Sequence, residues 1–222
     1  MKMLRHFLGL AIAIAGLTQA AQALPSLRIF DGTTTITITD NAAGDSSGVA
    51  GRVVWDGTIG NWTLNTHVGT GYPVLGSLSN PVLDLSFNAV SNGAGGTLTI
   101  SFSVDGFGPT SGSATAMIGG TAGGTVMYRT GGGTNNTLFN MSNILTTQGP
   151  FTSAFSGSAT GGAINNVGPY SLTQQIQITH TGAGISTGNS LLTVPDSGTS
   201  VLLLGTGLMG LACMARLRKR LA

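Results

Sequence analysis

One segment of the chain formally matches a catalytic motif. Gly44-Asp45-Ser46-Ser47-Gly48 fits the G-x-S-x-G pattern, in which a strained serine between a strand and a helix acts as a nucleophile. The flanking residues do not predict that context, because residues 40–43 favour a turn and Val49–Trp55 favours a strand. We therefore interpret this segment as a loop.

The same region carries oxygen atoms that suit a hard cation. Calcium binds about six to eight oxygens from carboxylates, amides and backbone carbonyls, and Asp40, Asn41 and Asp45 would supply some of them. The EF-hand pattern is absent, because no Glu closes the loop. Asn and Asp also favour turns by capping their own backbone. We expect no metal or cofactor, with calcium at these three residues as the alternative.

The remaining polar residues do not form a recognisable zinc or catalytic site. Neither His67 nor His180 has a Cys, a Glu or a second His at ligand spacing. Alternation with neighbouring residues places His67 on a solvent face and His180 at a strand end. Glycoside hydrolysis needs two carboxylates brought together, and the spacing of the Asp residues does not predict such a pair. The sequence therefore predicts a protein that is not an enzyme.

Charge limits the range of partners. Between Leu24 and Val194, three basic residues (Arg28, Arg52 and Arg129) stand against six Asp, which leaves a net charge of −3. The overall charge of +2 comes from basic residues at the two ends of the chain. Nucleic-acid binding depends on clustered cations that displace counterions from phosphates. A nucleic-acid partner is therefore not expected.

Short segments in which apolar and polar residues alternate run through the middle of the chain, as strands with one buried face do. The alternating apolar sets are Ile36 and Ile38; Trp62, Leu64 and Val68; Leu83, Leu85 and Phe87; Leu98, Ile100, Phe102 and Val104; Leu172, Ile176 and Ile178. Clusters such as Asp56-Gly57 and Gly161–Asn166 are interpreted as turns between them. Residues 24–193 are predicted to form one all-β domain, an antiparallel β-sandwich or jelly-roll-like fold. The high Gly content leaves a flexible spacer as the alternative.

The N-terminus has the three parts of a secretory signal peptide, which is predicted to form a helix and to be removed on export. They are the basic residues Lys2 and Arg5, the apolar segment Phe7–Leu17, and the cleavage site Ala21-Gln22-Ala23. Residues 1–23 are assigned to it, and cleavage would make Leu24 the first residue of the mature protein.

The C-terminal segment 194–222 combines a polar motif, an apolar run and a basic end. Residues 199–215 carry no charge and approach the length of about 17–25 residues that a transmembrane helix needs. Residues 216–222 are predicted to stay in the cytoplasm, because basic residues are retained on that side. The stop-transfer residues are Arg216, Arg218, Lys219 and Arg220.

Val194, Pro195, Asp196, Ser197 and Gly198, followed by the apolar run and the basic end, resemble the VPDSG variant of the PEP-CTERM sorting signals of Gram-negative bacteria. The resemblance implies that these five residues are recognised by a membrane-embedded exosortase, as part of a substrate and not as catalysts. It implies export through the inner membrane and anchoring in membrane lipid by the C-terminal helix. The exported domain would then lie in the periplasm or, after sorting, on the cell surface.

These observations together predict an exported, membrane-tethered and surface-sorted protein without enzymatic activity. Its role would be structural or associated with an exopolysaccharide matrix, which Thr, Ser and Asn side chains would contact. Two alternatives remain open. One is a secreted hydrolase of envelope polysaccharide that uses Asp residues, and the other is a calcium-stabilised adhesin module.

Overall fold

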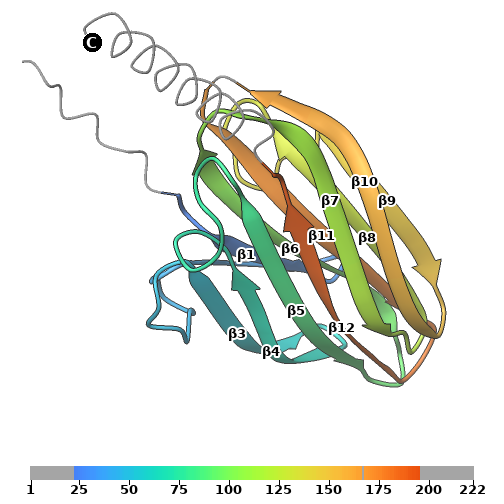
Figure 1. Ribbon diagram of the computed structural model, residues 1–222. Coiled ribbons are helices and arrows are strands. Elements are labelled where there is room, and N and C mark those ends of the chain that lie inside the picture. Colours follow the sequence, from blue (N-terminus) through green and yellow to red (C-terminus); the bar gives the residue numbers. More distant parts are fainter. Residues whose placement is uncertain (1–22, 167, 196–222) are drawn as a thin grey trace, which may run out of the picture.

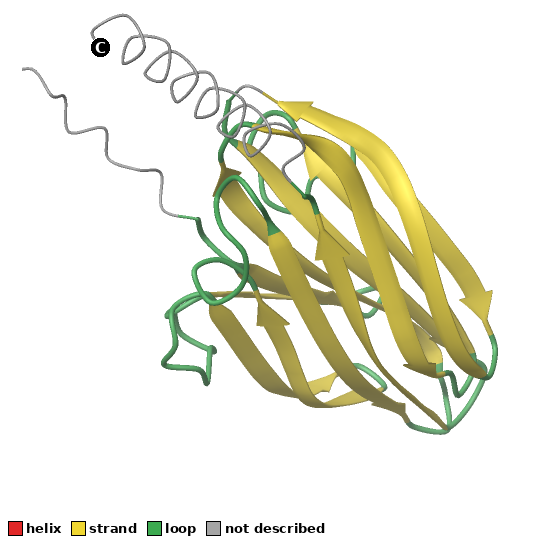
Figure 2. Cartoon of the chain, in the orientation of Figure 1, coloured by secondary structure: helices red, strands yellow, loops and turns green. Residues whose placement is uncertain are grey.

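The computed structural model describes residues 23–166 and 168–195, which contain strands and no helix (Figures 1 and 2). The strands are β1 (Ser26–Phe30), β2 (Thr35–Thr39), β3 (Arg52–Ile59), β4 (Trp62–Thr70), β5 (Val82–Ser91), β6 (Gly96–Phe107), β7 (Thr110–Thr121), β8 (Thr125–Gly133), β9 (Asn143–Phe151), β10 (Ala154–Asn166), β11 (Tyr170–His180) and β12 (Gly184–Thr193). The all-β prediction is confirmed. No helix within these ranges could cross a membrane, and the predicted signal helix and transmembrane segment lie outside them.

The strands form two antiparallel sheets of six strands each. Sheet A has the order β2-β1-β6-β11-β8-β9, and sheet B has the order β10-β7-β12-β5-β4-β3. The pairs from β5 to β12 are nested, because β8 pairs with β9, β7 with β10, β6 with β11, and β5 with β12. This nested winding across two sheets is the connectivity of a jelly roll. Strands β1 and β2 extend sheet A, and β3 and β4 extend sheet B (Figure 1).

The core lies between the two sheets and is built from the predicted alternation. Leu98, Ile100, Phe102 and Val104 of β6 are fully buried, because every second residue of a strand points to the same face. The sheets approach closely at Gly69 of β4, where an added Cβ would lie 2.2 Å from the ring of Phe102. Only glycine fits at that contact without displacement of the ring.

The prediction for the second half of β4 was wrong. His67 was placed on the solvent face with Val68 in the core, yet His67 is fully buried and Val68 is only half-buried. The pairing of β4 with β5 shifts register between Leu64 and Val68. Such an irregularity reverses the faces to which the following side chains point, so His67 takes an inward position.

Two clusters that were interpreted as turns lie inside strands. Asp56-Gly57 is part of β3 and Gly161–Asn166 is part of β10. Both coincide with a register shift, between Trp55 and Gly57 in one case and between Thr160 and Ala163 in the other. Glycine inside a strand often marks a bulge rather than the end of the strand. At Gly57 the backbone has φ 156°.

Candidate functional site

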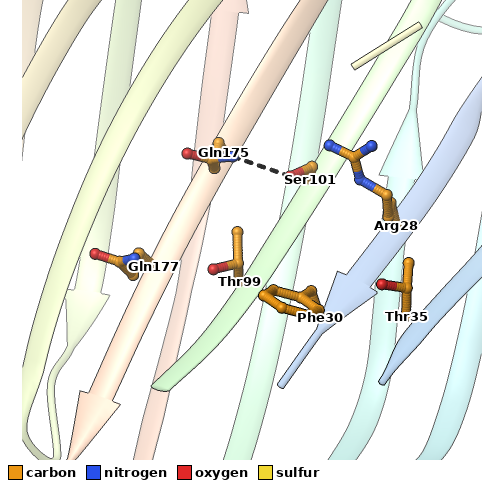
Figure 3. Close-up of a pocket in the computed structure, with 7 residues that line it drawn as sticks. All are labelled: Arg28, Phe30, Thr35, Thr99, Ser101, Gln175 and Gln177. Atoms are coloured by element: carbon orange, nitrogen blue, oxygen red, sulfur yellow. Dashed lines mark hydrogen bonds between the residues drawn. The ribbon is translucent and has the colours of Figure 1, made fainter. Parts of the chain in front are cut away.

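A groove of about 430 Å³ lies on the outer face of sheet A and is the candidate functional site. Its lining comes from β1, β2, β6 and β11, four adjacent strands of the sheet. The lining residues are Arg28, Phe30, Thr35, Thr99, Ser101, Gln175 and Gln177 (Figure 3). They combine one cation, one aromatic ring, hydroxyls and amides, and they include no carboxylate.

Antiparallel pairing arranges these side chains in two rows that cross the strands, because residues directly opposite each other share a face. The first row consists of Thr37, Arg28, Ser101, Gln175 and Arg129, on β2, β1, β6, β11 and β8 in turn. The second row consists of Thr35, Phe30, Thr99, Gln177 and Met127. The first row thus has an arginine on β1 and another on β8, with neutral polar residues between them.

Arg28 is positioned by an aromatic ring. Its guanidinium carbon lies 4.3 Å from the ring centroid of Phe139, a cation–π geometry. Among the described residues no carboxylate forms an ion pair with it. Partial burial lowers the pKa of Arg28 through desolvation, but an arginine stays charged at neutral pH. The groove therefore contains a charged guanidinium without a carboxylate partner on this face.

Phe139 belongs to the β8–β9 connection, residues 134–142, which folds over the outer face of sheet A. The backbone N–H of Phe139 donates to Ser103 Oγ at 2.9 Å, and Ser171 Oγ donates to the carbonyl of Thr137 at 2.6 Å. The side-chain oxygen of Asn136 accepts the N–H of Gly106 at 2.7 Å. These bonds fix the connection to β6 and β11, so the ring of Phe139 is held beside Arg28.

Phe30 supplies an exposed aromatic surface in the second row, with 38% of the residue accessible. An aromatic ring beside amides and hydroxyls suits a ligand that has both apolar faces and polar groups. Gln175 and Gln177 point from β11 toward the groove, and the amide of Gln175 lies 3.5 Å from Ser101 Oγ (Figure 3). The chemistry that this arrangement supports is binding.

This groove was not predicted from the sequence. The segments Gln175-Ile176-Gln177 and Leu27-Arg28-Ile29 carried a signal for it, because long polar side chains there alternate with buried apolar residues. The side chains come from β1, β2, β6 and β11, and of these only β1 and β2 are consecutive in the sequence. Strand order alone brings them together.

The loop that was considered for calcium uses its carboxylates to hold its own backbone. Asp45 Oδ1 accepts the N–H groups of Ser47 and Val54, both at 2.9 Å, and Asp45 Oδ2 accepts that of Asn41 at 3.0 Å. Asp40 Oδ2 accepts the N–H of Gly51 at 2.7 Å. Within the described residues, no group of three or more His, Cys, Asp or Glu could hold a metal ion.

Ser46 lies in this loop and lacks the surroundings of a nucleophile. Its hydroxyl donates to the carbonyl of Val54 at 3.1 Å, and its N–H donates to the same carbonyl at 2.9 Å. The segment after it leads into β3 rather than into a helix. The interpretation of Gly44–Gly48 as a loop is confirmed.

His180 is a buried link between the two sheets. Ser91 Oγ lies 2.7 Å from Nδ1 and donates its own proton to the carbonyl of Gly182 at 2.8 Å. Ser186 Oγ lies 2.8 Å from Nε2 and accepts the N–H of Gly123 at 3.0 Å. Nδ1 is therefore the protonated nitrogen and Nε2 the acceptor, and desolvation lowers the pKa of this neutral histidine.

His67 differs from His180, because neither of its ring nitrogens has a hydrogen-bond partner among the described residues. Burial lowers the pKa of its imidazole to about 3. The charged form is thus strongly disfavoured in the folded protein. His67 is therefore a neutral residue of the core, and its burial does not suit the role of a metal-binding side chain on a solvent-facing surface.

Only the edges of the two targeting segments fall within the described residues. Val194 is fully buried in the core, and its N–H donates to the carbonyl of Pro81 at 3.0 Å, whereas Pro195 is exposed. At the other end Ala23 is buried and Leu24 is exposed. The remaining predicted residues lie outside the described ranges: Ala21, Asp196, Ser197, Gly198, Arg216, Arg218, Lys219 and Arg220.

Comparison with solved structures finds weak similarities. The K1 cleaved adhesin domain of Lys-gingipain from Porphyromonas gingivalis W83 is 13% identical with a TM-score of 0.34, over 66% of this chain and 99% of that one. A family 35 carbohydrate binding module from Clostridium thermocellum is 20% identical with a TM-score of 0.25, over 64% and 98%. The enzymatically active domain of bacteriophage CBA120 tailspike protein 4 is 12% identical with a TM-score of 0.32, over 63% and 20%. Scores this low show neither a shared fold nor a shared function.

No curated protein sequence matches the chain. A family of C-terminal motifs does match, and it covers the segment that the sequence analysis singled out. This type of signal implies export, association with the membrane or the cell surface, and processing by an exosortase-type enzyme. Residues 193–218 match the VPDSG-CTERM motif, a sorting signal of the PEP-CTERM type.

Proposed function

We propose that this chain is an exported protein which is sorted to the cell surface through its C-terminal signal and acts there without catalysis. Its jelly-roll domain would have a structural role or a role in an exopolysaccharide matrix. The observation that carries this proposal is the match of residues 193–218 to the VPDSG-CTERM motif.

The position of the signal supports display of the whole domain. The motif match starts at Thr193, the last residue of β12, and Val194 is still part of the core. No described residues separate the folded domain from the signal. Any anchor or transfer at the signal would therefore hold the domain close to the surface to which it is attached.

The environment of the carboxylates supports a role without catalysis. Five of the six Asp before residue 195 accept hydrogen bonds from neighbouring groups, which fix backbone or surface structure. They are Asp31, Asp40, Asp45, Asp84 and Asp105. Asp84 has a pKa raised by desolvation, but its carboxylate accepts bonds from the amide of Asn189 at 3.0 and 3.2 Å.

The intact mass of the native protein, recovered from membrane and cell-surface fractions, tests the sorting. We expect a chain that starts at Leu24 and ends within residues 195–198, with or without an added group, in the surface fraction. A chain that runs through Ala222 and stays in the inner membrane would contradict surface sorting.

The hydrolase alternative is tested on the same material. Native protein is incubated with the cell's own matrix polysaccharide, and the release of reducing sugar is measured. We expect none above the level of a heat-denatured sample. Release that disappears on replacing one Asp by Asn, in a variant that still folds, would establish the hydrolase instead.

A further inference from the structure

We infer that the outer face of sheet A binds an extended acidic polysaccharide, whose carboxylates meet Arg28 and Arg129 while the chain crosses β6 and β11. This inference rests on the proposed function in one respect, because the outer face of sheet A contacts polysaccharide only if the protein is exported. The juxtaposition that carries it is the first cross-strand row. In this row each residue lies opposite the next on the neighbouring strand, in the order Arg28, Ser101, Gln175 and Arg129.

The spacing of the two arginines sets the kind of ligand. β1 and β8 are separated by β6 and β11, so three inter-strand steps lie between the two residues. At roughly 4.8 Å per step, their backbones are about 14 Å apart. A single sugar does not bridge that distance. A chain of sugars that carries an acidic group at intervals does.

The state of Arg28 indicates a carboxylate. Arg28 is half-buried, and its guanidinium lies over the ring of Phe139 without a carboxylate partner among the described residues. A planar guanidinium donates two parallel hydrogen bonds to a carboxylate. Stacking on a ring whose own position is fixed by Ser103 lowers the entropy lost when Arg28 binds a ligand. Arg129 is exposed at the other end of the row and is free of any carboxylate in the described part of the chain.

The residues between and beside the arginines suit sugar units. Gln175 and Gln177 offer amides and Thr99 offers a hydroxyl to the hydroxyl groups of sugar rings. Ser101 is buried, and its hydroxyl accepts the amide of Gln175 at 3.5 Å. Phe30 is exposed next to them and presents a ring on which the apolar face of a sugar packs. This is the mixture of few polar groups and an aromatic surface that ligand sites use.

The charge on sheet A suits a carboxylated polysaccharide better than nucleic acid. The six strands of sheet A contain two Arg and a single acidic residue, Asp105, whose carboxylate accepts the N–H of Leu24 at 2.8 Å. Two cations suffice to pair with two carboxylates along one polysaccharide chain. They are too few for nucleic acid, whose binding gains free energy from many released counterions.

The test uses the native protein recovered from cells and immobilised, with polygalacturonate as the probe. We expect saturable binding to polygalacturonate and at least tenfold weaker binding to fully methyl-esterified polygalacturonate, which has the same sugars without charge. Arg28→Gln and Arg129→Gln are each expected to weaken binding about three- to tenfold. Phe30→Ala is expected to weaken binding of the esterified and the free polymer alike.

Arg52→Gln is the matched control, because Arg52 is the third arginine of this domain and lies exposed on β3 of the other sheet. It should leave the affinity unchanged. Equal binding of free and esterified polymer, equal loss in all three arginine variants, or tighter binding of duplex DNA than of polygalacturonate would each overturn the inference. Arg129→Gln keeps the test decisive if Arg28→Gln fails to fold, since Arg129 is exposed.

The two proposals fail separately. A correctly processed, surface-located protein that binds no polygalacturonate would refute the acidic-polysaccharide site and leave the proposed sorting intact. A full-length protein retained in the inner membrane that binds the polymer through Arg28 and Arg129 would refute the sorting and leave the site intact.

Discussion

Leu24 and Asp105 are joined by a hydrogen bond of 2.8 Å, in which the backbone N–H of Leu24 donates to the carboxylate. Leu24 is also the residue that signal-peptide cleavage is predicted to leave as the N-terminus. Cleavage there replaces a peptide N–H by an α-ammonium group at the same place. The bond would then become an ion pair between the new terminus and Asp105.

This relationship predicts that Asp105→Asn destabilises the mature protein by about 1 kcal/mol, because the ammonium group loses its charged acceptor at a partly exposed site. Thermal unfolding of the processed protein measures the effect. Asp56→Asn is the control, since Asp56 is an exposed residue of β3 whose carboxylate accepts no hydrogen bond from another described residue. Equal shifts in both variants, or a mature chain that starts elsewhere, would argue against the pairing.

The buried His67 predicts sensitivity to acid. Burial lowers the pKa of His67 from its ordinary value of 6.5 to about 3 in the folded protein, so the unfolded state binds more protons between these two pH values. The free energy of unfolding is therefore highest above about pH 6.5 and falls as the pH drops toward 3, by at most about 4–5 kcal/mol. His180, whose pKa is also lowered, contributes in the same direction.

Replacing His67 by Leu removes both the titration and the two unpaired nitrogens. We expect the variant to be at least as stable as the parent at pH 7 and to lose less stability between pH 6.5 and 4, measured by denaturant unfolding at each pH. His180→Asn is the comparison, because it breaks the bonds to Ser91 and Ser186 and should destabilise the protein at neutral pH as well. Parallel pH curves for parent and His67→Leu would contradict the assignment.

Much of the fold could be predicted from the sequence. Regular alternation predicted the correct inward residues of β5, β6 and β11, because these residues lie where β5 pairs with β12, and β6 with β11, without a register shift. The prediction failed where parity is broken, at the β4 irregularity beside His67 and at the glycines of β3 and β10. A bulge depends on the partner strand and on close contacts across the sheet. Local sequence does not contain that information.

The sorting signal could be predicted because all its parts lie in one continuous segment. The groove could not, since Arg28 and Arg129 are about a hundred residues apart in sequence and meet in one row only through the pairing of β1 with β6, β6 with β11 and β11 with β8. Phe139 was also not foreseen beside Arg28. Its position depends on a loop with φ of 55° at Asn136 and 59° at Phe139.

The loop between β2 and β3 should be stable without calcium. Three backbone N–H groups already bind the carboxylate of Asp45. We expect a chelator to leave the melting temperature unchanged. Asp45→Ala should lower the free energy of unfolding by about 2–3 kcal/mol, because three backbone N–H groups lose their acceptor, two of them in partly buried hydrogen bonds. Ser47→Ala, which removes only the bond from Val49 N–H to the hydroxyl, is the milder control. A melting temperature that falls with chelator would restore the calcium alternative.

The junction between β12 and the sorting signal predicts that two adjacent residues of the motif have separable roles. Val194 is fully buried and bonded to Pro81, so Val194→Ala should cost about 1–2 kcal/mol of stability through lost burial and a small cavity. Pro195 is exposed, so Pro195→Ala should leave the melting temperature unchanged while reducing the processed fraction at the cell surface. Both quantities are measured on each variant, by thermal unfolding and by intact mass. If Pro195→Ala is processed as well as the parent, then Pro195 is not recognised by the sorting enzyme. If Val194→Ala unfolds no more easily than the parent, then the signal does not begin inside the core.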